Sequence, residues 1–348
     1  MQHSACHSVG IIANPASGRD IRRLVARASV FQTAEKVNMV LRLSAALGAL
    51  GVGRVLMMPD LGGIAAGVQR GIPKQPTAIP GPEFVFLDMP IEQGPADSAR
   101  ATQLMVEAGV ALIVVLGGDG THRVVAGHCG DVPLVTLSTG TNNTFPELRE
   151  ATLAGLAAGL VASGRVALDE ACRRNKQLVV QTATRRELAL VDVAVSPQRY
   201  IGARAVWQAG GLAEVFVAFA EPDAIGLSSI AGLLDPVGRA EPHGLYVRLD
   251  PAAAICQLTA PIAPGLLATL PVAAHDRLAP GQPRPVALSA GTLALDGERE
   301  IEFGPADRPR VWLELSGPRT VDVPTTLRLA AARGLLATLR STQEERSP

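Results

Sequence analysis

One aspartate stands among glycines at the end of an apolar run, in the sequence ALIVVLGGDGT (111–121). Glycines let the backbone approach a ligand closely, and the N–H groups that open a following helix attract an anion such as phosphate. A carboxylate beside phosphate is repelled unless it ligates Mg²⁺ or takes a proton from an attacking hydroxyl. The segment from Gly117 to Thr121 therefore indicates phosphoryl chemistry, with Asp119 as base or metal ligand. The alternative is a tight turn in which Asp119 caps the helix through the N–H of Thr121 or His122.

Two other polar turns follow predicted strands in the same way. NPASG (14–18) comes after the first strand, and TGTNN (139–143) comes after a short one. The carboxyl ends of parallel strands meet at one edge of a sheet, where ligands bind in open α/β folds. Asn14 and Ser17 could there reach phosphate or ribose, although NPASG by itself is equally compatible with a plain turn. Three polar, glycine-containing turns at one edge favour a ligand site.

Alternating strands and helices position these turns in the first half of the chain. Apolar runs of strand length predict strands at 8–14, 53–60, 82–90, 110–116 and 131–138. Helical periodicity predicts helices at 20–50, with an interruption, and at 62–70, 96–108 and 121–128. Such alternation is typical of a parallel sheet with helices on both faces. We therefore expect an α/β nucleotide-binding domain over residues 1–164.

The pattern changes after Gly164 to short strands separated by Gly and Pro. Strands are predicted at 243–250, 254–265, 284–291 and 310–317, and helices at 201–220 and 225–233. A second, mostly antiparallel β-rich domain is therefore expected over residues 165–318. The last segment, 319–348, returns to helical periodicity at 325–340 and is expected to pack on the first domain. A free amphipathic tail is the alternative.

The composition favours a small-molecule partner and a cytoplasmic protein. Acidic and basic residues balance at 32 each and aromatic residues make up 3%, which argues against the basic, aromatic surface of a nucleic-acid binder. The hydrophobic fraction is 47%, but no window offers the eighteen or so apolar residues that a bilayer crossing needs. The start, MQHSACHSVG, lacks the positive and apolar regions of a signal peptide. The 4 cysteines have no CxxC spacing, which argues against a zinc site or a disulfide framework.

The motifs also carry a resemblance to a known family. GGDGT with the preceding NPxSG turn and the following TGTNN resembles the superfamily that joins NAD kinases to diacylglycerol and sphingosine lipid kinases. GPADSARA at 94–101 is similar to the family's segment before GGDGT, and LALDGERE at 293–300 is similar to the DGE motif of lipid kinases. More narrowly, IIANPASGRDIRRLVARAS (11–29) and STGTNNTFPELREATLAGLAAGL (138–160) resemble the acetoin-catabolism protein X group of ATP-NAD kinase-like proteins. The likeness covers essentially the whole chain.

The resemblance implies ATP and Mg²⁺ as cofactors and assigns residues to a nucleotide site. It implies that Asp119 is the base or a metal ligand, and that ATP phosphates are bound by Gly117, Gly118, Asp119, Gly120 and Thr121. Three residues are implied to line the nucleotide site, namely Asn14, Ser17 and Gly18. Two more are implied to hold ATP or the acceptor, namely Asn142 and Asn143. The metal ligands are left open.

The DGE motif implies a second functional carboxylate. In lipid kinases the glutamate of this motif is catalytic, which points to Glu298, with Asp296 beside it. A carboxylate from the second domain could close over the cleft and complete the site. The alternative is an ordinary hairpin turn, for which Asp-Gly is a strong signal.

Departures from the family patterns bear on the acceptor. The Gly-Asn-Gly-Leu-Gly-Phe and Thr-Gly-Ser-Thr-Ala segments of NAD kinases are absent, the closest stretch being DAIGLSSIAG at 223–232. Lipid kinases usually carry an acidic residue soon after GGDGT, where this chain has His122 and Arg123. His122 is expected on the solvent face of its helix, the alternative being that it positions a substrate or stabilises the transferring phosphate. Three arginines after NPASG could clamp phosphates, at least one of them lying instead on a solvated helix face: Arg19, Arg22 and Arg23.

These observations predict an ATP-dependent phosphotransferase whose acceptor is a hydroxyl of a small metabolite or a nucleotide. The resemblance links this activity to acetoin catabolism. The alternatives are an NAD(H) kinase, a lipid kinase and a nucleotide-binding regulator without turnover. The balanced charge and the scarcity of lysine argue against stable association with anionic membranes. The resemblance implies a homo-oligomer. The acceptor and the preferred phosphoryl donor stay open.

Overall fold

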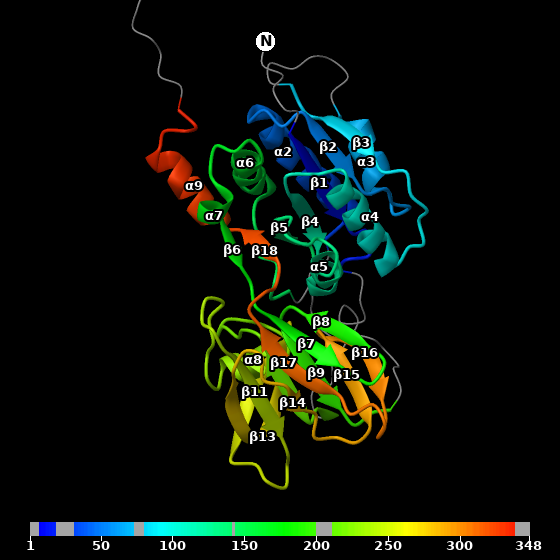
Figure 1. Cartoon of the computed structure of the whole chain (residues 1–348), viewed down its shortest axis with the longest axis vertical. Helices are drawn as coiled ribbons and strands as arrows, with labels where there is room; N and C mark the ends of the chain where they lie inside the picture. The colour runs from blue at the N-terminus through cyan, green and yellow to red at the C-terminus, as the bar shows by residue number, and fades with distance from the viewer. Residues whose placement is uncertain (1–6, 19–30, 73–79, 141–142, 200–210, 338–348) are drawn as a thin grey trace, which may run out of the picture.

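The computed structural model describes residues 7–18, 31–72, 80–140, 143–199 and 211–337. Two domains follow one another along the long axis of the molecule, the first built of helices and strands and the second mostly of strands (Figure 1). The chain passes into the second domain after Arg174 and returns to the first before Arg319.

The first domain is organised around one seven-stranded sheet. Its strand order is β3 (Glu83–Phe86), β2 (Arg54–Met57), β1 (Ser8–Ala13), β4 (Ile113–Gly117), β5 (Leu134–Ser138), β18 (Arg319–Val321) and β6 (Cys172–Arg174). The strands from β3 to β18 are parallel, and only β6 runs antiparallel to its neighbour. All side chains of β1 and β4 are buried, as expected of strands covered on both faces. The predicted α/β class is confirmed.

Helices cover both faces of this sheet. One face is covered by α2 (Thr33–Ala49), α3 (Ile64–Gly71) and α6 (Ala151–Ala162), and the other by α4 (Pro95–Glu107) and α5 (Asp119–Ala126). Along β1, Val9 and Ile11 pack into the first core, whereas Ile12 packs into the second. The last helix, α9 (Val323–Ala332), packs against α6 and the short α7 (Leu168–Ala171). The first part of the predicted helix 20–50 lies outside the described residues.

The second domain contains two antiparallel sheets. The larger has the order β12 (Cys256–Ala263), β13 (Leu266–Leu278), β11 (Gly244–Leu249), β10 (Glu214–Val217), β9 (Asp192–Ser196), β15 (Gly291–Leu295) and β16 (Glu298–Phe303). The smaller has the order β14 (Arg284–Pro285), β17 (Arg310–Glu314), β7 (Gln177–Gln181) and β8 (Arg186–Ala189). Phe216 of the larger sheet and Val311 of the smaller belong to one core, and α8 (Ser228–Gly232) packs on the other face of the larger sheet. The predicted β-rich second domain is confirmed.

Two element predictions in this domain are wrong. The stretch 211–220 contains strand β10 instead of a helix, and residues 201–210 of that prediction lie outside the described part. All four side chains of β10 are buried, so the strand lacks the alternation of apolar and polar residues that would have indicated it. The predicted strand 284–291 is mostly loop, since β14 covers only Arg284 and Pro285. Proline has no N–H with which to extend the ladder.

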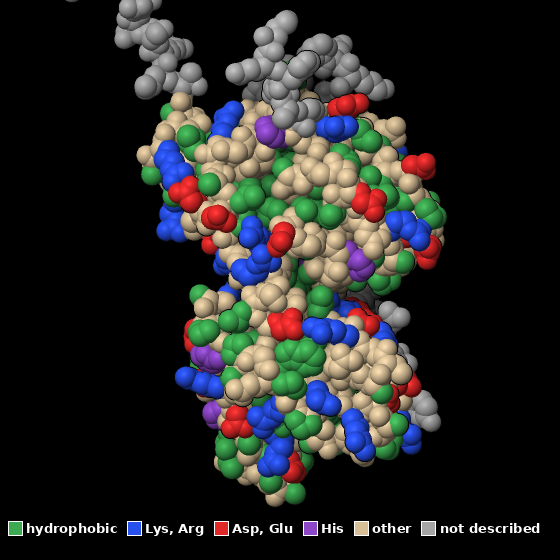
Figure 2. Space-filling model, viewed as in Figure 1, with side chains coloured by type: hydrophobic (Ala, Val, Ile, Leu, Met, Phe, Trp, Pro, Cys, Tyr) green, Lys and Arg blue, Asp and Glu red, His purple; other side chains and the backbone are tan. Residues whose placement is uncertain are grey.

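The surface carries both signs of charge. On the face shown in Figure 2, acidic and basic side chains are interspersed over both domains, in keeping with a formal net charge of +0. Across the described ranges, no helix is both long and apolar enough to span a lipid bilayer.

Candidate active site

A cavity of about 370 Å³ opens at the carboxyl edge of the parallel sheet, between the two domains. The turns after β1, β2, β3, β4 and β5 all line it, and the β15–β16 hairpin contributes from the second domain. The lining residues that the sequence singled out are Asn14, Ser17, Gly18, Gly118, Asp119, Gly120, Thr121, Asn143 and Glu298. Gly117 ends β4 without lining the cavity. The other predicted residues lie outside the described part of the chain, namely Arg19, Arg22, Arg23 and Asn142.

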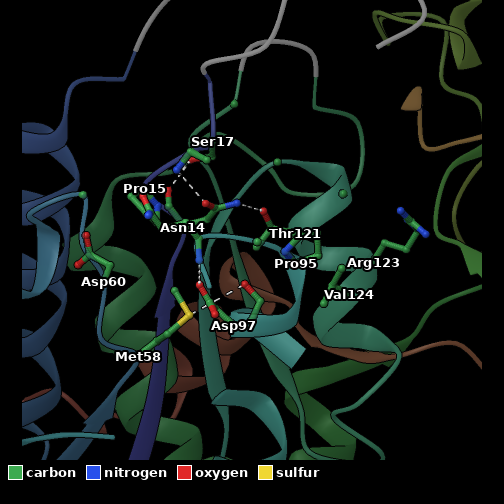
Figure 3. A pocket seen from close by; sticks show the side chains of 18 of the residues that line it. Asn14, Pro15, Ser17, Met58, Asp60, Pro95, Asp97, Thr121, Arg123 and Val124 are labelled. Carbon is green, nitrogen blue, oxygen red and sulfur yellow. Dashed lines mark hydrogen bonds between the residues drawn. The ribbon is translucent and has the colours of Figure 1, made fainter. Parts of the chain in front are cut away.

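Hydrogen bonds tie the three polar turns together. Asn14 donates from Nδ2 to Thr121 Oγ1 at 2.8 Å, and its Oδ1 accepts the N–H of Ala16 at 2.8 Å. Ser17 Oγ and Thr139 Oγ1 lie 2.8 Å apart. Figure 3 shows Asn14 between Ser17 and Thr121 at the edge of the pocket. NPASG, GGDGT and the start of TGTNN thus form one continuous hydrogen-bonded rim.

The glycines of this rim are needed because side chains lie against their backbone. A Cβ on Gly117 would lie 2.5 Å from Thr121 Cβ, and a Cβ on Gly140 would lie 2.6 Å from the amide of Asn143. Asn143 in turn donates from Nδ2 to Ser138 Oγ at 2.7 Å. The glycines therefore allow the polar side chains of the rim to lie directly over the chain.

Asp119 is buried at the start of α5, with only 9% of its surface exposed. Its carboxylate accepts the N–H of Phe145 at 2.9 Å and the N–H of Thr144 at 3.1 Å. Both donors follow TGTNN directly, whereas the helix-cap alternative requires donors in the first turn of α5. Asp119 therefore binds the segment between β5 and α6. It lines the cavity at the carboxyl edge of the parallel sheet.

Lys36 supports the NPASG turn from beneath, and sequence reasoning missed it. Its side chain is 1% exposed, and Nζ donates to the carbonyl oxygens of Asn14 at 2.9 Å, Pro15 at 3.3 Å and Ser17 at 2.9 Å. A buried ammonium needs such a set of acceptors to offset the loss of hydration. Lys36 lies in α2, so the first helix fixes the shape of the first turn.

The DGE motif forms a hairpin turn that brings Glu298 to the cavity. Asp296 and Gly297 have φ of 50° and 76° and form the two-residue turn of the β15–β16 hairpin. Asp296 is buried and accepts the N–H groups of Leu190 at 3.0 Å and Val191 at 2.8 Å, and burial raises its pKa to about 6. Glu298 lines the cavity, and its carboxyl group lies 3.9 Å from the position of a Cβ on Gly120. Asp296 thus anchors the hairpin while Glu298 faces α5.

The charge of the cavity lining is mostly negative. Its carboxylates are those of Asp60, Asp97, Asp119, Asp296, Glu298 and Glu300, and Arg123 is the only Lys or Arg among the described lining residues. No three His, Cys, Asp or Glu side chains in the described ranges are grouped closely enough to hold a metal ion. Mg²⁺, however, usually takes one or two carboxylates together with phosphate oxygens. Asp119, at the start of α5, and Glu298, whose carboxyl group lies 3.9 Å from the Cβ position of Gly120, fit that smaller donor set.

Comparison with known proteins identifies the family. Residues 9–166 match the ATP-NAD kinase N-terminal domain, and residues 176–316 match the acetoin catabolism protein X C-terminal domain. The chain is 50% identical over 338 residues to acetoin catabolism protein X of Cupriavidus necator, covering 95% of this chain and 94% of that protein. The chain belongs to the acetoin catabolism protein X family. The resemblance stated from the motifs is thereby confirmed.

A solved structure is also similar in outline. A putative diacylglycerol kinase from Bacillus anthracis str. Sterne is 12% identical, with a TM-score of 0.48, and the match covers 92% of this chain and 98% of that one. The family assignment rests on the family models and the sequence relative alone.

In this member of the acetoin catabolism protein X family, an arginine of the second domain supports the segment that binds Asp119. Arg239 donates to the carbonyl oxygens of Thr144 and Phe145, the residues whose N–H groups the carboxylate accepts. Its guanidinium lies 4.1 Å from the ring centroid of Phe219, and burial lowers its pKa to about 10. No sequence pattern indicated Arg239, because its partner Thr144 is 95 positions away.

His122 was predicted to face solvent, and that prediction is wrong. The side chain is fully buried beside Phe145, with ring centroids 6.0 Å apart, and Nδ1 lies 2.9 Å from the carbonyl oxygen of Gly118. The residue occupies the face of α5 that turns towards the protein interior, which a short helix with few apolar residues does not reveal from sequence. Burial lowers the pKa of His122 to about 4.

The buried imidazole predicts a loss of stability in acid. Between about pH 6.5 and 4 the unfolded state binds a proton at His122 and the folded state does not, so the free energy of unfolding falls as pH falls. Asp296 acts in the opposite direction, because its raised pKa lets the folded state take up a proton first. Replacing His122 by Phe isolates the first effect. Relative to this variant, the wild type is expected to lose about 2 kcal/mol between about pH 7.5 and pH 5 in urea unfolding. If the stability difference between wild type and variant is the same at both pH values, the folded protein protonates His122 as readily as the unfolded chain does.

Proposed function

We propose that this protein transfers the γ-phosphoryl group of ATP to a hydroxyl of a small metabolite or nucleotide. The observation that carries the proposal is the position of Asp119, a buried carboxylate at the start of α5 inside a cavity bounded by three glycine-containing turns. The N–H groups of the first turn of α5 suit an anion, and the carboxylate suits a hydroxyl that must lose a proton. The NAD kinase-like first domain supports the same class of chemistry.

Each residue then has a chemical role. The acceptor oxygen attacks the γ-phosphorus, the bond from that phosphorus to the β,γ-bridging oxygen breaks, and ADP leaves. Asp119 takes the hydroxyl proton, while backbone N–H groups at Gly118 and Gly120 stabilise charge on the transferring group. Mg²⁺ bound with ATP would neutralise phosphate charge, with Asp119 or Glu298 as protein ligand. Asn14, Ser17 and Asn143 hold the nucleotide.

The test is a transfer assay with a panel of acceptors. The full-length protein is incubated with γ-labelled ATP and Mg²⁺, together with NAD, NADH, diacylglycerol vesicles and small hydroxy compounds that include acetoin. Label in a soluble hydroxy compound other than NAD or NADH is the expected result. Label in NAD or in diacylglycerol would establish the corresponding alternative acceptor. Saturable binding of ATP without transfer to any acceptor would contradict the proposal.

A nucleotide-binding regulator is the second candidate. The observation in its favour is that both oxygens of the Asp119 carboxylate already accept backbone N–H groups, as a purely structural carboxylate does. Such a regulator would bind ATP in calorimetry, and its affinity would depend on Asn14 and Ser17. A cytoplasmic location and a homo-oligomeric state stay predictions of the sequence.

A further inference from the structure

The β15–β16 hairpin presents three carboxylates to the cavity from alternate positions. Asp296, Glu298 and Glu300 all line it, and Glu298 is the middle one. The register of the hairpin shifts between Leu293 and Ala294, so Glu300 is the extra residue of a β-bulge. Residues at alternate positions of a strand point to the same face, so Glu298 and Glu300 both line the cavity. The geometry of the hairpin therefore brings a third acidic group to the domain interface.

One arginine of the first domain binds the two outer carboxylates. Arg123 Nη2 donates to Glu300 Oε1 at 2.8 Å, and Nε lies 3.7 Å from Asp296 Oδ2. The arginine side chain is 11% exposed, and the two carboxylate side chains are 0% and 21% exposed. Ion pairs shielded from water in this way lose little strength to solvent and salt. Arg123 therefore clamps the hairpin on both sides of Glu298.

The arginine of this clamp lies on the same helix face as the start of α5. Arg123 follows Gly120 by three positions, so the two residues lie on neighbouring turns of one helix face. The Glu298 carboxyl group lies 3.9 Å from the Cβ position of Gly120. Without the guanidinium, the three carboxylates of the hairpin would line one cavity with Asp119 and with no cation among the described lining residues. Their mutual repulsion would move the hairpin away from α5.

We propose that Arg123 is a positioning residue, which holds the β15–β16 hairpin against α5 through Glu300 and Asp296 and so sets the Glu298 carboxylate at the start of that helix. The role of Glu298 in transfer belongs to the proposed function. The clamp itself joins the two domains and stands on geometry alone.

The first experiment measures the position of the hairpin without any turnover. Hydrogen exchange of residues 291–303 is followed by mass spectrometry in the wild type, in Arg123→Gln and in Arg100→Gln. Arg100 is a suitable control because it lies in α4 of the same domain and makes only an exposed ion pair with Glu92. Exchange of the hairpin is expected to become about tenfold faster in Arg123→Gln and to stay unchanged in Arg100→Gln. Unchanged exchange in Arg123→Gln overturns the proposal.

The second experiment asks whether Arg123 acts through Glu298. Arg123→Gln is expected to lower kcat by about 10²-fold with KM for ATP unchanged, because the carboxylate is displaced. In a Glu298→Gln background the same substitution is expected to cause no further loss. The charge exchange Arg123→Glu with Glu300→Arg should restore part of kcat. An equal loss in both backgrounds overturns the proposal. If no acceptor is phosphorylated, the proposed function fails and hydrogen exchange alone decides on the clamp.

Discussion

Replacing Asp119 by Asn is expected to lower kcat for phosphoryl transfer by about 10³-fold or more while the protein stays folded and binds ATP. The variant keeps one oxygen that can accept the N–H of Phe145. It cannot take a proton from the acceptor hydroxyl, and its amide NH₂ would meet the N–H of Thr144, which the carboxylate now binds. A stability loss of about 1–3 kcal/mol is expected from that unsatisfied contact. Initial rates with labelled ATP measure the loss of kcat, urea unfolding measures the loss of stability, and calorimetric titration checks that ATP still binds.

Asp97 provides the matched control for this substitution. It is also buried, lines the same cavity and accepts two backbone N–H groups, those of Glu92 and Gln93, at 2.8 Å each. Asp97→Asn should therefore cost similar stability but lower kcat far less, since Asp97 lies in α4 and outside the glycine-containing turn. Equal losses of kcat in the two variants would show that Asp119 acts as a structural carboxylate and would favour the regulator.

The sequence predicted the core of the fold because the decisive signals were local. The runs that became β1, β4 and β5 are short and mostly apolar, and each is followed at once by a polar turn containing glycine. Because parallel strands end at one edge, the convergence of NPASG, GGDGT and TGTNN could be expected before any coordinates. Only the resemblance predicted that Glu298 belongs to the site. The Asp-Gly pair by itself indicates a hairpin turn, and it forms one.

What the sequence missed depends on contacts between distant segments. β10 has four buried side chains and no alternation, so its strand character follows from its place in the middle of a sheet. Arg123 and Arg239 gain their partners across the domain interface, where no spacing rule applies. For Lys36 the sequence contains one usable signal, which is the rarity of lysine. In a chain whose basic residues are nearly all arginine, both lysines within the described ranges are buried and donate to loop carbonyls, namely Lys36 and Lys176.

The second large effect is expected from Lys36→Met. Methionine has a similar length but no donor, so the carbonyl oxygens of Asn14, Pro15 and Ser17 lose the ammonium that binds them. Unpartnered buried acceptors and the loss of a charge-assisted set of bonds predict a decrease of about 3–5 kcal/mol in the free energy of unfolding. The NPASG turn also loses its fixed shape, so ATP affinity should fall by tenfold or more, about 1.4 kcal/mol. Urea unfolding and calorimetric titration of ATP measure these two quantities.

Lys176→Met is the control that separates a loss of stability from a change in the shape of the NPASG turn. Lys176 is also buried, and its Nζ donates to the carbonyl oxygens of Gly238 at 2.9 Å and His243 at 2.7 Å, in the second domain. That loop carries Arg239, which contacts the segment binding Asp119, so this variant should lower kcat and leave ATP affinity unchanged. Lys36→Met should instead lower the affinity for ATP. If both variants bind ATP equally well, the shape of NPASG does not depend on the ammonium beneath it, and the nucleotide is held elsewhere.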